Sequence, residues 1–170
     1  MKRLLGLDVG DRTIGVAVSD ELGITAQAVG VHQRTSWAAD LAYLHELLRR
    51  YDPAAIVVGL PKNMDGSLGP QAQKTLAFMA RLRQACGRPV IAWDERLTTR
   101  LAERILLAGD TSRRRRKHVR DQLAAQLILQ TYLEWQSQHG DTRASDMRLI
   151  PQDAGRNAEG GEVGQPDAGQ

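Results

Sequence analysis

The sequence predicts an α/β fold with a mixed five-stranded sheet flanked by helices, and two patterns support this. The first third of the chain contains three short apolar runs separated by turn-forming residues, which is typical of an antiparallel meander. The remainder alternates helical segments with two short, continuously apolar runs. Strands of that second kind are buried on both faces, as in a parallel sheet covered by helices. The sheet is therefore expected to be antiparallel on one side and parallel on the other.

The three N-terminal strands are expected at residues 4–9, 14–19 and 24–32. Residues 10–13 (Gly-Asp-Arg-Thr) and 21–23 (Glu-Leu-Gly) separate them, and both segments contain residue types that favour turns. Because two apolar runs joined by so short a segment form a hairpin, the three strands are expected to form a meander.

Beyond residue 35 the apolar periodicity becomes helical, with Leu41, Leu44 and Leu48 recurring after a Ser36 N-cap. Pro and Gly residues then mark where successive elements end. The expected elements are a helix from Ser36 to Asp52-Pro53, a strand at 55–60, a loop at 62–69, a helix at 70–86, a strand at 90–93, a helix capped by Thr98 or Thr99 and running through Ala108, and, after the basic stretch 112–117, a long helix at about 118–136.

The 170 residues are enough for one compact domain, expected at residues 1–140. Charge is unevenly distributed, since residues 1–140 carry 20 Lys and Arg against 14 Asp and Glu, whereas residues 141–170 carry three against six. The last segment is rich in Gly, Asp, Gln and Ala and is expected to be a disordered acidic tail. The basic charge of the folded part favours polyanionic partners.

Cysteine content and hydropathy indicate the cellular compartment in which the protein is expected. The single cysteine, Cys86, excludes an internal disulfide framework and is consistent with a reducing environment. Residues 1–10 lack the apolar stretch of a signal peptide, and no run approaches the length of a membrane span. We therefore expect a cytoplasmic protein with no membrane partner.

Three acidic residues occupy positions where their side chains are expected to face the interior. Asp8 lies within an apolar strand, where an ionised carboxylate is costly unless positive charge compensates it. Glu95 directly follows a buried strand, and α/β sheets usually place ligand sites at the carboxyl ends of strands. Asp121 shares one helical stripe with the apolar Ile128 and Tyr132, because residues three and four apart lie on one helix face.

A divalent cation is the simplest stabiliser for such a cluster. Oxygen ligands with few histidines favour Mg²⁺ or Mn²⁺, and two such ions about 4 Å apart can bridge a phosphodiester, activate water and stabilise the leaving oxygen. Each carboxylate also has a simpler interpretation. Asp8 could lie at an edge or turn, and Glu95 could pair with Arg96. Asp121 could simply complement the helix dipole. Only the convergence of Asp8, Glu95 and Asp121 favours a metal site.

Four segments also carry a family resemblance. They are LGLDVGDRTIGVAVSD (residues 5–20), VVGLPKNMDGSLGPQAQ (57–73), WDERLTT (93–99) and RDQLAAQLILQTYL (120–133). In this order they resemble the YqgF/RuvX family of Holliday junction resolvases, also described as pre-16S ribosomal RNA nucleases. The resemblance implies an RNase H-like fold and a catalytic triad at Asp8, Glu95 and Asp121. The segment after about residue 140 has no counterpart in the family pattern.

The first segment alone is also similar to the first phosphate-binding hairpin of actin-like and sugar-kinase ATPases. Those proteins need two such domains and a second phosphate loop, whereas this chain is short and contains no second copy of the hairpin. An ATPase is therefore the less favoured interpretation, and an ATP-binding assay separates it from a nuclease.

Polar and basic residues around the three carboxylates are candidate contacts for nucleic acid. Lys62 and Asn63 follow a buried strand, where a lysine can bind phosphate, although an ordinary surface loop is an equal interpretation. Arg96 could bind phosphate or orient Glu95. The basic run before Asp121 is the strongest electrostatic feature and favours phosphate contacts over a merely solvated face. The complete set is Lys62, Asn63, Arg96, Arg113, Arg114, Arg115, Arg116, Lys117 and Arg120.

The sequence therefore predicts a metal-dependent endonuclease that cleaves structured nucleic acid, either a Holliday junction or the 5′ region of pre-16S rRNA. The family chemistry implies 5′-phosphate and 3′-hydroxyl ends. Since junction resolution requires two symmetrical cuts, it would favour a homodimer. The alternative is a non-catalytic nucleic-acid-binding module on the same scaffold. Aromatic residues make up only 4% of the chain, which argues against extensive base stacking.

Overall fold

The computed structural model describes residues 2–96 and 113–139, with side chains from residue 122 onward in the second range. The elements are β1 (Leu4–Val9), β2 (Thr13–Ser19), β3 (Ala26–Gln33), α1 (Trp37–Tyr51), β4 (Ala55–Leu60), α2 (Pro70–Cys86), β5 (Val90–Asp94) and α4 (Arg113–His139). The five strands form one sheet in the order β3-β2-β1-β4-β5. Pairing is antiparallel from β3 to β1 and parallel from β1 to β5, which confirms the predicted mixed sheet.

Two elements start at least two residues away from the predicted position, and both differences have a clear physical reason. β3 begins at Ala26 rather than residue 24 because the Asp20 carboxylate accepts hydrogen bonds from the backbone N–H groups of Ile24 and Thr25, which holds both in the turn. The last helix begins at Arg113 rather than near residue 118. The basic stretch is therefore part of α4 rather than a segment leading into it, since Arg and Lys have high intrinsic helix propensity.

The capping residues of α1 behave as their types predict. The Ser36 hydroxyl oxygen accepts a hydrogen bond from the backbone N–H of Ala39 at 3.1 Å. At the other end, Asp52 adopts a left-handed conformation and its N–H donates to the carbonyl of Leu48. The predicted helix between Ser36 and Pro53 is thus confirmed.

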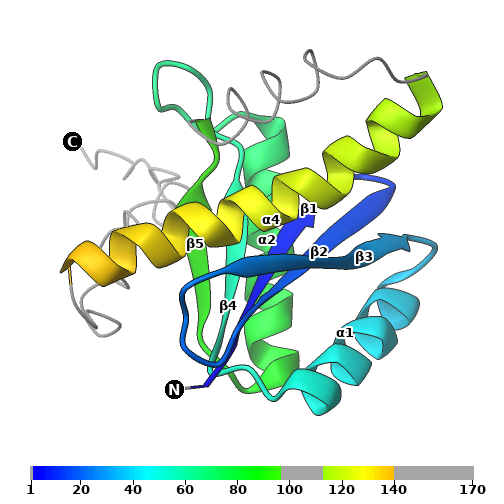
Figure 1. Cartoon of the computed structure of the whole chain (residues 1–170). Coiled ribbons are helices and arrows are strands. Elements are labelled where there is room, and N and C mark those ends of the chain that lie inside the picture. Colours follow the sequence, from blue (N-terminus) through cyan, green and yellow to red (C-terminus); the bar gives the residue numbers. More distant parts are fainter. Residues whose placement is uncertain (1, 97–112, 140–170) are drawn as a thin grey trace, which may run out of the picture.

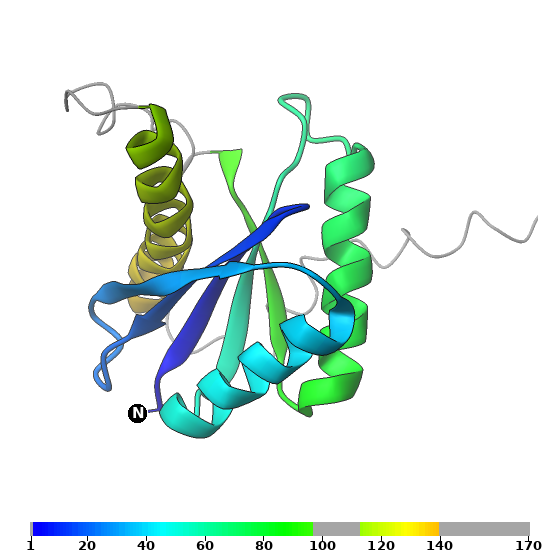
Figure 2. The same cartoon turned by 90° about the vertical axis from the view of Figure 1, so that its right-hand side faces the viewer.

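Helices cover both faces of the sheet. α1 and α2 lie on one face and α4 crosses the other, as Figures 1 and 2 show from two directions. Alternate residues of β1 divide between the two cores. Leu5 and Leu7 are buried in the core shared with α1 and α2, whereas Leu4 is buried with α4 residues such as Ile128. By the same alternation, Asp8 projects toward the α4 face.

Two predicted segments lie outside the described residues. These are the helix expected between Thr98 or Thr99 and Ala108, and the tail expected at residues 141–170. Among the described helices, none is long and apolar enough to cross a membrane.

Candidate active site

The candidate active site lies where the three parallel strands end. Because β1, β4 and β5 run in the same direction, their carboxyl ends meet at one edge of the sheet. The backbone N–H of Glu95 donates to the carbonyl of Leu60 at 3.3 Å, so contact with β4 continues one residue beyond β5. This fixed backbone brings Glu95 to the same edge as Asp8.

Asp8 and Glu95 lie close enough to share a hydrogen bond, although β4 separates their strands. Both residues are half-buried. Burial raises the pKa of Glu95 to about 8, assisted by the negative charge of Asp8, the hydrogen bond with Asp8 and the charge of Asp94. Two carboxylates this close cannot both ionise easily, so the pair retains a proton when no cation balances it.

Gly59 of β4 provides the space into which Glu95 fits. A β-carbon at residue 59 would lie 3.1 Å from Glu95 Oε1 and would collide with Cδ1 of Ile128 from α4. Gly59 is a site residue that was not predicted from the sequence. The available signal was a glycine inside an otherwise apolar, fully buried strand, because such a glycine often marks a close approach of another group.

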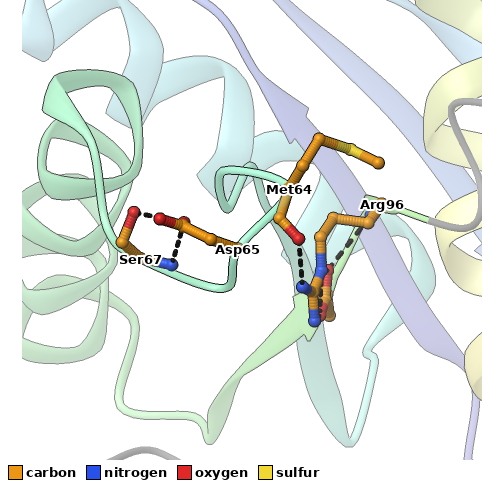
Figure 3. A network of polar contacts seen from close by, with 5 residues as sticks. Met64, Asp65, Ser67 and Arg96 are labelled. Atoms are coloured by element: carbon orange, nitrogen blue, oxygen red, sulfur yellow. Dashed lines mark hydrogen bonds and ion pairs between the residues drawn. The ribbon is translucent and has the colours of Figure 1, made fainter.

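Arg96 pairs with Asp94, not with Glu95 as one interpretation of the sequence proposed. Its Nε and Nη2 atoms donate to Asp94 Oδ2 at 2.9 and 2.6 Å. Burial alone would raise the pKa of Asp94, but the hydrogen bonds and charge of Arg96 outweigh it and lower that pKa. Nη1 of Arg96 reaches the carbonyl of Met64 at 3.4 Å, which links the end of β5 to the loop after β4 (Figure 3).

That loop is held by its own side chains. Asn63 Nδ2 donates to the Ser67 hydroxyl at 2.9 Å, and the hydroxyl donates to Asp65 at 2.6 Å; Figure 3 shows the Ser67–Asp65 contact. The hydrogen bonds from Ser67 lower the pKa of Asp65. Asn63 is thus engaged in shaping the loop, whereas the positive charge of Lys62 lies near enough to Asp94 to help lower its pKa.

α4 packs closely over β1 through a glycine. A β-carbon at Gly6 would lie 2.7 Å from Cβ of Leu129 and 3.3 Å from the carbonyl oxygen of Ala125. Asp121 lies in α4 one helical turn before the fully buried Ala125. The side chains of Asp121 and of the predicted basic contacts in α4 lie outside the described residues; those contacts are Arg113, Arg114, Arg115, Arg116, Lys117 and Arg120.

The donors that meet at this edge suit a hard divalent cation. Asp8 and Glu95 offer only carboxylate oxygens, which Mg²⁺ and Mn²⁺ prefer. A cation between them would remove the repulsion that raises the pKa of Glu95. Among the described side chains, no group of three or more His, Cys, Asp or Glu residues is arranged to hold a metal ion, and the side chain of Asp121 is not among those described. The observed pair is therefore compatible with such an ion.

Sequence comparison identifies the family. The family model described as "RuvX: Holliday junction resolvase" matches residues 2–135. A protein of Symbiobacterium thermophilum named "Putative pre-16S rRNA nuclease" is 57% identical over 132 residues, covering 78% of this chain and 92% of the relative. A protein of Moorella thermoacetica with the same name is 56% identical over 138 residues, covering 81% and 99%.

Solved structures show the same fold. RuvC of T. thermophilus, in complex with a Holliday junction substrate, gives a TM-score of 0.50 at 22% identity, over 79% of this chain and 96% of that chain. The yeast mitochondrial resolvase Ydc2 gives 0.50 at 12% identity, over 88% and 85%. The sheet and helices described above thus form an RNase H-like fold. The chain belongs to the RuvX family of Holliday junction resolvases and is a nuclease that hydrolyses phosphodiester bonds.

Proposed function

We propose that the chain is a divalent-metal-dependent endonuclease in which Asp8, Glu95 and Asp121 hold two Mg²⁺ or Mn²⁺ ions. The single observation that supports this most strongly is the approach of Asp8 to Glu95. A protein that only binds nucleic acid gains nothing from two half-buried carboxylates, since their charge repels phosphate. Asp121 completes the proposed ligand set. It lies one turn before the part of α4 that packs over Gly6, and Gly6 is two residues from Asp8 in β1.

The ions, when bound, would supply an activated water and stabilise the leaving oxygen. The surrounding residues of the chain hold the carboxylates in position. Asp8 is fixed by a strand paired on both sides, and Glu95 by its backbone bond to Leu60 and by the space above Gly59. Carboxylates held this firmly keep their geometry without rearrangement during the reaction. In-line attack would leave 5′-phosphate and 3′-hydroxyl ends.

The nucleic acid would be held mainly through its phosphates. The basic N-terminal part of α4, residues 113–117 with Arg120, lies immediately before Asp121 and would bind the strand next to the scissile bond. Lys62 lies near Asp94 at the same edge of the sheet. Arg96 and Asn63 are already engaged with protein partners, so we assign them first to shaping the loop and second to contacting nucleic acid.

The proposed substrates are a four-way DNA junction and the 5′ region of pre-16S rRNA. Both present closely spaced phosphates, and the proposed contact residues would bind phosphates rather than bases. Resolution of a junction by two symmetrical cuts would further require a homodimer.

The decisive test incubates purified protein with a labelled four-way junction and with a structured precursor RNA, each in Mg²⁺, Mn²⁺ or chelator. We expect cleavage of at least one substrate in the presence of either ion, and none in chelator. Asp8→Asn should abolish cleavage while retaining the fold by circular dichroism. Asp52→Asn, at an exposed carboxylate of the α1 C-cap, is the matched control and should cleave normally. Full cleavage by Asp8→Asn would overturn the proposal. Binding without any metal-dependent product would instead indicate a non-catalytic module.

A further inference from the structure

A cavity with charged side chains in its lining lies on the face of the sheet opposite the carboxylates. It has a volume of about 270 Å³ and lies between α2, the start of α1 and the end of β1. Figure 2 shows α2 and α4 on opposite sides of the sheet. The cationic side chains in its lining are Arg34, Lys74 and Arg81, and Asp11 is the acidic one. None of the three cations belongs to the contacts predicted from the sequence.

Arg34 is held rigidly at this cavity. Its Nε donates to the buried carboxylate of Asp40 at 2.9 Å, and its Nη1 donates to the carbonyl of Gly10 at 2.7 Å. The guanidinium also lies over the ring of Phe78, 5.3 Å from its centroid. Within the described part of the chain, Nη2 of Arg34 donates to no protein acceptor. This nitrogen therefore remains available to donate a hydrogen bond to a ligand in the cavity.

Arg81 lines the same cavity and stacks on a neighbouring aromatic ring. Its guanidinium lies 4.2 Å from the centroid of Trp37, and Trp37 packs edge-on against Phe78. An arginine stacked on a ring keeps the N–H groups at its edge available for a ligand. Among the described residues Arg81 has no ion pair and no hydrogen bond, so its charge is uncompensated.

Lys74 adds a third cation at the rim. Its ammonium lies 3.4 Å from Asp11 Oδ1, and both side chains are largely exposed, so the ion pair is weak. Asp40 offsets Arg34 and Asp11 offsets Lys74, which leaves the charge of Arg81 in excess. Two guanidinium groups and a flexible ammonium beside one cavity are suited to a phosphate group, which accepts several charge-assisted hydrogen bonds at once.

The cavity lies close to the proposed cleavage site. Val9 lines the cavity from β1, and its neighbour Asp8 projects toward the other face. Because consecutive α-carbons are about 3.8 Å apart, the cavity and the carboxylates lie on either side of the same strand end. A nucleic acid strand that bends around this edge of the sheet can therefore reach both.

We propose that the cavity formed by Arg34, Lys74 and Arg81 binds a backbone phosphate of the nucleic acid substrate, next to the strand that is cut. This proposal rests on the function proposed above. It extends the nucleic-acid path from the α4 face to the α2 face. The chemistry it requires is a phosphate on a polynucleotide, as distinct from free phosphate.

The test compares the affinities of three proteins for a labelled four-way junction and a structured RNA, measured by fluorescence anisotropy in chelator so that no cleavage occurs. The first is the wild type and the second is Lys74→Gln/Arg81→Gln. Arg34 is left in place because its removal would leave Asp40 buried with one partner fewer. The third, Arg49→Gln/Arg50→Gln, removes the same charge from the exposed far end of α1 and is the matched control.

We expect the Lys74/Arg81 variant to bind at least one probe about tenfold more weakly, because it can no longer form charge-assisted hydrogen bonds at the cavity. The slope of log affinity against log salt should fall by about one for each phosphate that the variant no longer neutralises. The control should bind as the wild type does. Wild-type affinity of the cavity variant, or an equally weakened control, overturns the proposal. The proposal is also overturned if the binding of inorganic phosphate depends on Lys74 and Arg81 but the affinity for the junction and the RNA does not.

Failure of this proposal is distinguishable from failure of the nuclease proposal. The cavity variants are judged by binding in chelator, whereas the nuclease proposal is judged by metal-dependent product and by Asp8→Asn. A wild type that cleaves, together with a cavity variant that binds normally, rejects only the cavity. A wild type that never cleaves, together with a cavity variant that binds weakly, rejects only the metal chemistry.

Discussion

Glu95 and Gly59 meet at the edge of the sheet, where Oε1 of the carboxylate lies 3.1 Å from the point at which a β-carbon on residue 59 would stand. Gly59 pairs in register with Trp93, two residues before Glu95. A side chain at residue 59 would press on this carboxylate and would collide with Ile128. Gly59 thus leaves room for Glu95 at the end of the sheet where Asp8 lies.

Gly59→Ala should therefore reduce cleavage by more than its effect on stability explains. The added methyl displaces Glu95 and the tip of Ile128, and overpacking of this kind costs about 1–3 kcal/mol of unfolding free energy. Ile56→Val is the control, because it costs about 0.5–1.5 kcal/mol in the core that β4 shares with α1 and α2, away from Glu95 and α4. Cleavage rates are compared per folded molecule after urea denaturation of each variant. Equal rates for the two variants would show that Gly59 serves packing alone.

Without metal, the protein should lose stability as pH rises from about 5 to 9. The pKa of Glu95 is about 8 in the folded state, against about 4.3 in an unfolded chain. The folded state therefore binds more protons in that window, and the free energy of unfolding falls as pH rises through the folded pKa. Glu95→Gln removes this contribution. The difference in unfolding free energy between variant and wild type, measured in chelator, should grow with pH; a constant difference contradicts the pKa assignment.

Metal binding should stabilise the fold through all three carboxylates. Adding Mg²⁺ or Mn²⁺ in excess over its Kd raises the melting temperature because the ion binds only the folded state. We expect Asp8→Asn and Asp121→Asn each to diminish this rise, and Asp52→Asn to leave it unchanged. The comparison needs no substrate and so tests the ligand set separately from cleavage. A full metal-induced shift in Asp121→Asn would remove Asp121 from that set.

Arg96→Lys distinguishes the two roles considered for this residue. If Arg96 positions the loop after β4, a lysine at this position should not hold the loop in place. Lysine cannot bind Asp94 through two nitrogens while also reaching Met64. Cleavage should then drop while affinity for nucleic acid in chelator stays within about twofold, because the charge is kept. If Arg96 instead binds phosphate as a point charge, the lysine variant should retain cleavage and the alanine variant should lose affinity.

The sequence predicted the sheet well because its signals are local. Apolar alternation, turn residues and the Ser36 cap each act over a few residues, and they specified the five strands and their pairing pattern. The approach of Glu95 to Asp8 was expected because both residues lie at the carboxyl ends of strands. Two details of the site were not predicted. The role of Gly59 depends on Ile128, which is distant in sequence, and the partner of Arg96 depends on which of two adjacent carboxylates faces it. The cavity near Arg34 was missed because its cations come from separate elements.

The position of β1 at the centre of the sheet has a consequence for protein synthesis. Asp8 is synthesised long before its partner Glu95, which follows β5, and β5 joins the sheet through β4 rather than through β1. Contacts that span so much of the chain form late and slowly. A nascent chain that still lacks β5 therefore cannot assemble the carboxylate pair, so the proposed active site forms only when most of the domain has emerged.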